Sequence, residues 1–139
     1  MTIDSHLEAL SSAPLFHGMT ERALEAIARI ARPVTFAPGE PLVTEGEPGE
    51  SFLVIRRGAA RVTRNGSELR LLGAGDFLGE ISLIDGGSRT ATVTATDVVE
   101  AYEIPRVQFV ELIETHPAVR LGVLMALTER VRATATEEV

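Results

Sequence analysis

Glycine, proline and asparagine divide the middle of the chain, from about residue 34 to residue 104, into short segments. The turn signals are Pro38-Gly39, Glu45-Gly46, Pro48-Gly49, Arg57-Gly58, Asn65-Gly66, Gly73-Ala74-Gly75 and Asp85-Gly86-Gly87. Segments 52–55, 59–63, 69–72, 90–96 and 98–104 have the length and the β-branched content of strands. Asn65-Gly66 between two of them is a strong hairpin signal. This spacing predicts a β-sandwich or a barrel-like roll.

Two helices are predicted before this β region. Ser5 and Glu8 have the spacing of a capping box, which predicts a short helix near the N-terminus. Thr20 is suited to cap a second helix over residues 21 to about 31. Pro33 then ends the helical region, because a proline disfavours helix in the residue before it.

A helical pattern returns after Pro105 in two pieces, which His116-Pro117 separates. Proline is tolerated in the first turn of a helix, so Pro117 predicts the start of a long one. This last helix is apolar over more than half its circumference and should therefore pack on two sides. We expect its surface of Leu121, Leu124 and Met125 to be a core or dimer face.

The 139 residues are enough for one domain with its own core. We therefore predict a single α+β domain over residues 1–139, mainly β, with helices in 1–32, the β-roll in 33–105 and helices in 106–139. No apolar run approaches the roughly 20 residues that cross a membrane, and the N-terminus does not resemble a signal peptide. The chain has no cysteine. We expect a cytoplasmic protein that does not bind membranes.

Acidic residues outnumber basic ones, 20 to 13, giving a net charge of −7. Such a surface repels polyphosphate, so nucleic-acid binding by this chain alone is not expected. The densest basic group, Arg56, Arg57, Arg61 and Arg64, is interpreted as a solvated sheet face rather than an anion site, since Glu50 and Glu68 lie close in sequence.

The three histidines lie outside the β region and are predicted to be surface or helix-capping residues; they are His6, His17 and His116. A β-roll metalloenzyme needs several histidine and carboxylate ligands converging from strands. A serine-histidine-aspartate triad in the strands would need a histidine there as well. The chain is therefore predicted not to be an enzyme.

The segment GDFLGEISLIDGGSRTATV places one arginine, Arg89, nine positions after Glu80 in a glycine-rich stretch. Residues 79–84 have room for one helical turn whose free amides favour an anion. Glycine at 79 allows close backbone approach, and Arg89 could add a two-pronged contact to the same phosphate. The alternative is an exposed arginine in a turn and a carboxylate at a helix start.

The whole chain resembles the cyclic nucleotide-binding domain family. The residues that carry the resemblance are FLGEISLIDGGSRTA and the turns in APGEPLVTEGEPGESFLVIRRGAARV and GAGDF. The resemblance implies a jelly-roll fold, a phosphate-binding cassette over residues 77–91, a cyclic AMP or cyclic GMP ligand, and no cofactor or metal. Leu78 stands where the family more often has an aromatic residue, and Ser82 where it has alanine.

The resemblance also implies roles for single residues. Glu80 would accept the ribose 2′-hydroxyl, and Arg89 would pair with the cyclic phosphate. The amides of Ile81 and Ser82 would meet phosphate oxygens, close to Gly79. Thr90 would add a hydroxyl near the phosphate or the base, and Val62 and Leu69 would line the base pocket.

Two threonines bear on the base. In the family, a threonine directly after the arginine, here Thr90, favours guanine. Thr134 lies 45 positions beyond Arg89 (134 − 89 = 45), where bacterial regulators of the family carry a threonine that contacts adenine. The residue after it is Ala135 rather than the usual serine. We interpret the resemblance as favouring cyclic AMP over cyclic GMP. The apolar face of the last helix would serve, as an alternative, as a lid over the base.

These features predict a sensor module whose ligand moves its C-terminal helices. Two alternatives stay open: the sensing part of a larger transcription factor, enzyme or transporter, and a scaffold of the same fold that binds no ligand. Only five residues follow Thr134, whereas a helix-turn-helix needs two more helices, so operator binding by this chain is not expected. Possible protein partners are a second copy, through the last helix, or an effector.

Overall fold

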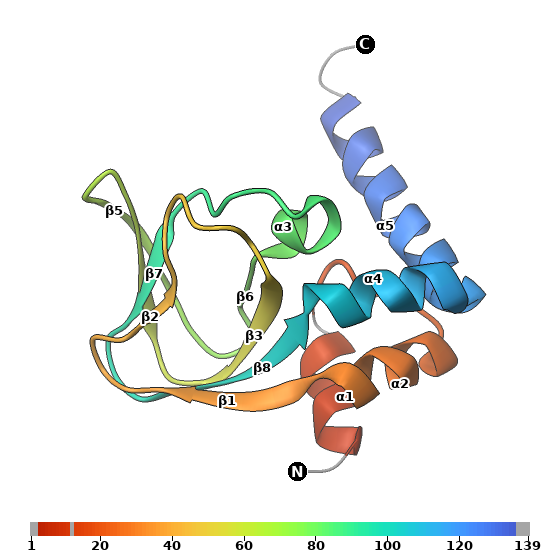
Figure 1. Cartoon of the computed structure of the whole chain (residues 1–139), viewed down its shortest axis with the longest axis horizontal. Helices are drawn as coiled ribbons and strands as arrows, with labels where there is room; N and C mark the ends of the chain where they lie inside the picture. The colour runs from red at the N-terminus through yellow and green to blue at the C-terminus, as the bar shows by residue number, and fades with distance from the viewer. Residues whose placement is uncertain (1–2, 12, 136–139) are drawn as a thin grey trace.

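The computed structural model describes residues 3–11 and 13–135. Two four-stranded antiparallel sheets form its centre, in the orders β1-β8-β3-β6 and β2-β7-β4-β5 (Figure 1). The strands are β1 (Arg32–Phe36), β2 (Pro41–Val43), β3 (Ser51–Arg57), β4 (Ala60–Arg64), β5 (Ser67–Leu72), β6 (Phe77–Leu78), β7 (Thr92–Ala95) and β8 (Val99–Pro105). Buried side chains of both sheets share one core, including Leu53, Ile55, Val62 and Val93. The predicted β-rich roll is confirmed.

The turn at Asn65-Gly66 joins β4 to β5. Both residues have positive φ, +51° and +80°, as a two-residue hairpin turn of type I′ requires. Asparagine and glycine tolerate this conformation best, so the local sequence dictates the hairpin. The hairpin prediction is confirmed.

The predicted strand over 90–96 is shorter in the structure, where β7 begins at Thr92. The residues before it pair with the loop after β2 instead of a strand. Arg89 N donates to Glu47 O at 2.8 Å, and Gly46 N donates to Arg89 O at 2.9 Å. This pairing leads the chain from the cassette into β7 without regular sheet geometry.

Four longer helices lie at one end of the sheets: α1 (Ile3–Ser11), α2 (Glu21–Ile30), α4 (Arg106–Thr115) and α5 (Pro117–Ala135) (Figure 1). Thr20 caps α2 as predicted, since its hydroxyl accepts from Ala23 N at 3.2 Å. Helix α1 begins at Ile3, so Ser5 lies within it and the predicted capping position is wrong. Tertiary packing of α1 against α2 and β3 overrides the local cap signal.

His6 corrects another prediction, because it is buried rather than at the surface. Its Nδ1 lies 2.9 Å from the carbonyl oxygen of Ala28, and its ring centroid lies 4.5 Å from that of Tyr102. A carbonyl only accepts, so Nδ1 carries the hydrogen in this contact. The imidazole therefore joins α1 to α2 and to β8.

The break at His116-Pro117 separates α4 from α5 as predicted. Val119 and Val123 on α5 are buried in the helical core, whereas Leu121, Leu124 and Met125 are each more than half exposed. The latter three are therefore not part of the core formed by residues 3–11 and 13–135, and within these residues α5 packs on one side only. Among the described residues, no helix is long and apolar enough to cross a bilayer.

Candidate functional site

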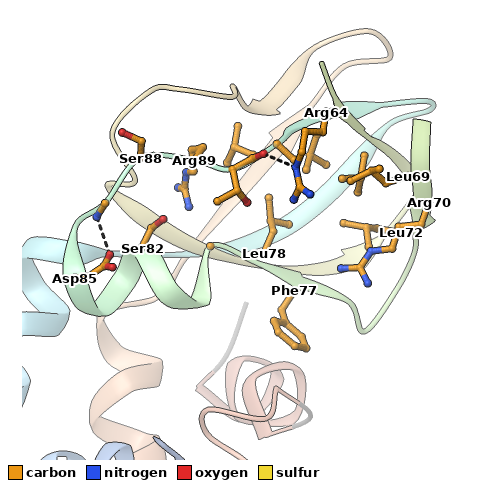
Figure 2. A pocket seen from close by; sticks show the side chains of 17 residues that line it. Arg64, Leu69, Arg70, Leu72, Phe77, Leu78, Ser82, Asp85, Ser88 and Arg89 are labelled. Atoms are coloured by element: carbon orange, nitrogen blue, oxygen red, sulfur yellow. Dashed lines mark hydrogen bonds between the residues drawn. The ribbon is translucent and has the colours of Figure 1, made fainter. Parts of the chain in front are cut away.

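A cleft of about 770 Å³ lies beside the six-residue helix α3 (Glu80–Asp85) and is lined by residues of both sheets and of the segment after α3 (Figure 2). At one end are Ser82, Ser88 and Arg89, and at the other are Leu69, Arg70 and Leu72. Predicted site residues that line it are Val62, Leu69, Gly79, Ser82, Arg89 and Thr90. Residues far apart in the sequence thus meet in one cavity.

Arg89 is a buried charged residue in the lining of this cleft, and only 8% of it is exposed. Its Nη2 donates to the carbonyl oxygen of Ser51 at 2.7 Å. Its Nη1 is buried with no hydrogen-bond partner among the described residues. The interpretation of Arg89 as an exposed turn residue is therefore wrong.

Burial lowers the pKa of Arg89 from its ordinary value, while the negative charges of Glu103 and Glu50 act in the opposite direction. An arginine nevertheless stays protonated in proteins. The cleft therefore holds a poorly hydrated cation with free donor capacity, which is an arrangement that attracts an anion.

Gly79 is the residue that makes room for this guanidinium. It precedes α3 in the left-handed conformation, with φ of +86°. A Cβ there would lie 2.2 Å from Arg89 Nη1 and 2.8 Å from Ser51 O. Both the backbone conformation and the space therefore require glycine.

Helix α3 confirms the predicted single helical turn, one residue later than expected. Its Ser82 is buried and faces the cleft, and Gly86 N donates to Ser82 O at 2.8 Å where the helix ends. Glu80 and Ile81 form its first turn, but their side chains lie outside the described part of the structure. Amides at a helix start have no partner within the helix, so this end presents donors.

The loop after β2 holds the cassette from the outside. Gly49 N donates to Gly87 O at 2.9 Å, and a Cβ at Gly49 would lie 2.1 Å from Ser82 Cβ. Asp85 accepts from Gly87 N at 2.7 Å, which closes the turn after α3 (Figure 2). The cassette is thus fixed by contacts on both sides of the turn that leads to Arg89.

Two arginines in the cleft were not predicted as site residues, Arg64 and Arg70. Arg64 is exposed, as expected for this basic group, yet it also reaches the cleft, and its Nε donates to Thr90 O at 2.9 Å (Figure 2). Within the same basic group, Arg61 forms an exposed ion pair with Glu68.

Arg70 enters the cleft through an irregularity in β5. Val62 pairs with Arg70 and Thr63 pairs with Glu68, so Leu69 is the extra residue of a β-bulge. A bulge redirects side chains, and here two consecutive residues, Leu69 and Arg70, line the same cavity. Strict alternation would send one of them away, and we find no local sequence signal for the bulge.

Thr134, the other predicted base contact, belongs to α5, but its side chain lies outside the described residues. No described side chain of α5 lines the cleft. Within the described residues, no three histidine, aspartate or glutamate side chains gather as a metal-ligand set.

A model of the family described as "Cyclic nucleotide-binding domain" matches residues 33–116. The chain belongs to the cyclic nucleotide-binding domain family. It is 30% identical to a "CRP-like cAMP-activated global transcriptional regulator" of Mycobacterium tuberculosis over 91% of this chain and 59% of that protein. It is 34% identical to a cGMP-dependent protein kinase of Toxoplasma gondii over 70% of this chain and 10% of that protein.

The crystal structure of the N-terminal domain of a transcriptional regulator from Streptomyces coelicolor superposes with a TM-score of 0.83. The two are 30% identical, and the match covers 91% of this chain and 94% of that one. The fold is therefore the jelly-roll of cyclic nucleotide-binding domains, as predicted. The chain spans about three fifths of the length of the mycobacterial regulator, 59%.

Proposed function

We propose that this chain is a sensor module that binds a cyclic nucleotide in the cleft, with the phosphate at Arg89. The observation that carries the proposal is the buried Nη1 of Arg89, which has no partner among the described residues. Nη1 has almost no accessible surface in this structure, so a small shift of the side chain would be needed for a phosphate oxygen to supply that partner. The phosphate would neutralise the cation at the same time. A neutral ligand would not add a negative charge beside this cation.

The remaining cassette residues would then contact the ligand as the family resemblance implies. The amides of Ile81 and Ser82 at the start of α3 would donate to the phosphate, and Glu80 would accept from the ribose. Thr90 lines the cleft beside Arg89, which supports a contact near the phosphate or the base. Val62 and Leu69 would pack on the base, and Gly79 keeps the backbone close to the phosphate.

Cyclic AMP is the first candidate ligand. The names of similar regulators from Mycobacterium tuberculosis and Thermus thermophilus refer to cyclic AMP. Thr134 would contact adenine if α5 closed over the cleft, which would also make its apolar face a lid. The proposal for Thr134 rests on the family resemblance alone.

Cyclic GMP is a second candidate, which the bulge in β5 favours. The bulge brings the guanidinium of Arg70 into the cleft at the end away from Arg89 (Figure 2). An arginine only donates, and guanine presents two acceptors, O6 and N7, where adenine presents an acceptor and a donor. Thr90 supports the same candidate, because in this family a threonine directly after the arginine favours guanine.

Calorimetric titration of the purified chain with each cyclic nucleotide tests the proposal. Binding of either nucleotide, lost in Arg89→Ala, is the expected result. An Arg70→Ala variant decides between the bases: it should weaken cyclic GMP binding and leave cyclic AMP binding within about twofold, because adenine lacks the paired acceptors. No heat and no thermal shift with both nucleotides would refute the proposal and favour a scaffold that binds no ligand.

The output we propose is a movement of the C-terminal helices. Aromatic side chains connect the cleft to them: Phe77 lines the cleft and stacks on Phe52, with ring centroids 6.0 Å apart. The ring centroids of Phe52 and Phe16 are 5.4 Å apart, and those of Phe16 and Phe109 on α4 are 6.1 Å apart. A ligand moves the helices only if it binds one of their arrangements better than the other.

The exposed apolar side chains of α5, Leu121, Leu124 and Met125, support a protein partner, either a second copy or an effector. Measuring the mass in solution with and without nucleotide distinguishes the two partners, since a second copy doubles the mass of the purified protein and an absent effector does not change it. We further propose that the module itself is not catalytic and is cytoplasmic. Whether it acts within a larger transcription factor, enzyme or transporter depends on the length of the complete gene product.

A further inference from the structure

Arg106, the first residue of α4, contacts the cassette helix. Its Nη2 donates to the carbonyl oxygen of Ile84, near the end of α3, at 3.1 Å. The guanidinium lies against Gly86, which ends α3 with φ of +71°. A Cβ at Gly86 would lie 2.9 Å from Arg106 Cζ and 3.1 Å from its Nε. Glycine at this position therefore both ends α3 and leaves space for the arginine.

The backbone of Arg106 is tied to the segment that holds Arg89. Arg106 N donates to Glu50 O at 2.8 Å, and the next carbonyl, Ser51 O, accepts from Arg89 Nη2 at 2.7 Å. Two successive carbonyls thus fix the arginine in the cleft and the start of α4. The side chain of Arg106 completes the connection by reaching α3.

We propose that Arg106 is a positioning residue of the cyclic nucleotide site, which holds α3 in place and makes α4 follow it. The inference rests on the proposed function. A six-residue helix is too short to be stable alone, and a cation at its C-terminal carbonyls stabilises it. The proposed ligand contacts the opposite end of α3, so a ligand that shifts this helix pulls on Arg106.

The local geometry leaves Arg106 able to accompany such a shift. Its Nε is buried with no hydrogen-bond partner among the described residues, so the guanidinium has donor capacity in reserve. Ile84 O is the acceptor at the end of α3, and Gly86 places no side chain in the way. The contact can therefore persist while α3 changes its position relative to β3.

The chain offers a matched control for removing this contact. Arg120 Nη1 donates to Ile113 O at 2.9 Å and to Glu114 O at 3.3 Å, so it too binds carbonyls at a helix end, but on α4 and outside the cleft lining. Arg106→Met and Arg120→Met each remove one such guanidinium. The dissociation constant for cyclic AMP and for cyclic GMP is measured by calorimetry for both variants and the unmodified chain.

Arg106→Met is expected to raise the dissociation constant roughly fivefold, because α3 would then be less ordered before the ligand binds, and Arg120→Met to leave it within about twofold. Arg106→Lys, which retains the charge, should recover part of the loss. If Arg106→Met does not fold, as circular dichroism would report, Gly86→Ala displaces the same guanidinium and replaces it in the comparison.

Coupling between α3 and α4 is tested by a distance measurement, because a residue that only stabilises the fold would not change the movement of α4 on ligand binding. The chain has no cysteine, so cysteines introduced at two exposed positions would be the only sites that a thiol-reactive spin label modifies. The positions are Thr35 on β1 and Gln108 on α4. Saturating nucleotide should change this distance in the unmodified chain and in Arg120→Met, and less or not at all in Arg106→Met.

The outcomes separate this inference from the function on which it rests. No binding by the unmodified chain overturns the proposed function and the role of Arg106 with it. Binding by the unmodified chain with an unchanged dissociation constant in Arg106→Met overturns the role of Arg106 alone. A full distance change in Arg106→Met also overturns the role of Arg106, as does the absence of any distance change in the unmodified chain at saturating nucleotide.

Discussion

Replacing Arg89 by methionine is expected to remove most of the ligand affinity. Methionine keeps an unbranched side chain in the same space and removes only the guanidinium. A hydrogen bond to a charged group contributes about 1.5–3 kcal/mol, so a two-pronged contact to phosphate supplies about 3–6 kcal/mol. Since about 1.4 kcal/mol corresponds to a factor of ten, the dissociation constant should rise at least about 100-fold.

The same substitution should change the stability of the free protein only moderately, because two contributions oppose each other. Losing Nη2 leaves Ser51 O, now bonded at 2.7 Å, without its partner, at a cost of about 1–3 kcal/mol. Losing the cation also has a stabilising effect, because it removes a charge that is unfavourable to bury. Burial lowers the pKa of Arg89, and its buried Nη1 has no hydrogen-bond partner among the described residues. We expect the free energy of unfolding to change by less than about 2 kcal/mol.

Calorimetry with both nucleotides and urea unfolding without nucleotide measure the two quantities separately. Arg57→Met is the control, because Arg57 is exposed and its Nη1 lies 3.2 Å from Glu100 Oε2, outside the cleft lining. That variant should bind as the unmodified chain does. An Arg89→Met protein that is folded and binds within about threefold of the unmodified chain would refute the assignment of Arg89 to the phosphate.

Three glycines give further predictions, each checked by urea unfolding and calorimetry. Gly79→Ala combines a positive φ of +86° with a Cβ 2.2 Å from Arg89 Nη1, so it should cost at least about 2 kcal/mol of stability and abolish binding. Gly66→Ala has a similar φ of +80° but open space, so it should cost about 1 kcal/mol and leave the dissociation constant unchanged. Gly49→Ala would place its Cβ 2.1 Å from Ser82 Cβ and should weaken binding by roughly tenfold through displacement of α3, whereas unchanged binding would show that the loop yields instead.

Features that depend on local chemistry were predictable from the sequence. The cap at Thr20, the turn at Asn65-Gly66 and the break at His116-Pro117 each follow from side-chain or φ preferences within a few residues. Gly79 and Arg89 were interpreted as anion contacts from the same kind of local pattern, and that role stays a prediction. Their use of one cavity is what the structure adds.

Features that depend on distant contacts were not predictable. His6 is buried because α1 packs against α2 and because Tyr102 of β8 provides a ring contact from 96 residues further along the chain (102 − 6 = 96). Arg70 lines the cleft because β5 is bulged where it pairs with β4, which alternation within β5 does not reveal. The contact between Arg106 and Ile84 joins two helices that the sequence separates by the whole of β7 and β8.

The net charge of −7 is compatible with the proposed anionic ligand, because the surface charge and the contact with Arg89 act over different distances. At physiological salt, exposed charges are screened beyond about 8 Å, so the acidic surface repels extended polyanions that lie along it. Arg89 is shielded from water. In the proposed complex it would meet one small anion at contact distance, where the interaction is screened much less. The acidic surface together with the buried guanidinium should therefore select a compact phosphate over nucleic acid, which neither feature would do alone.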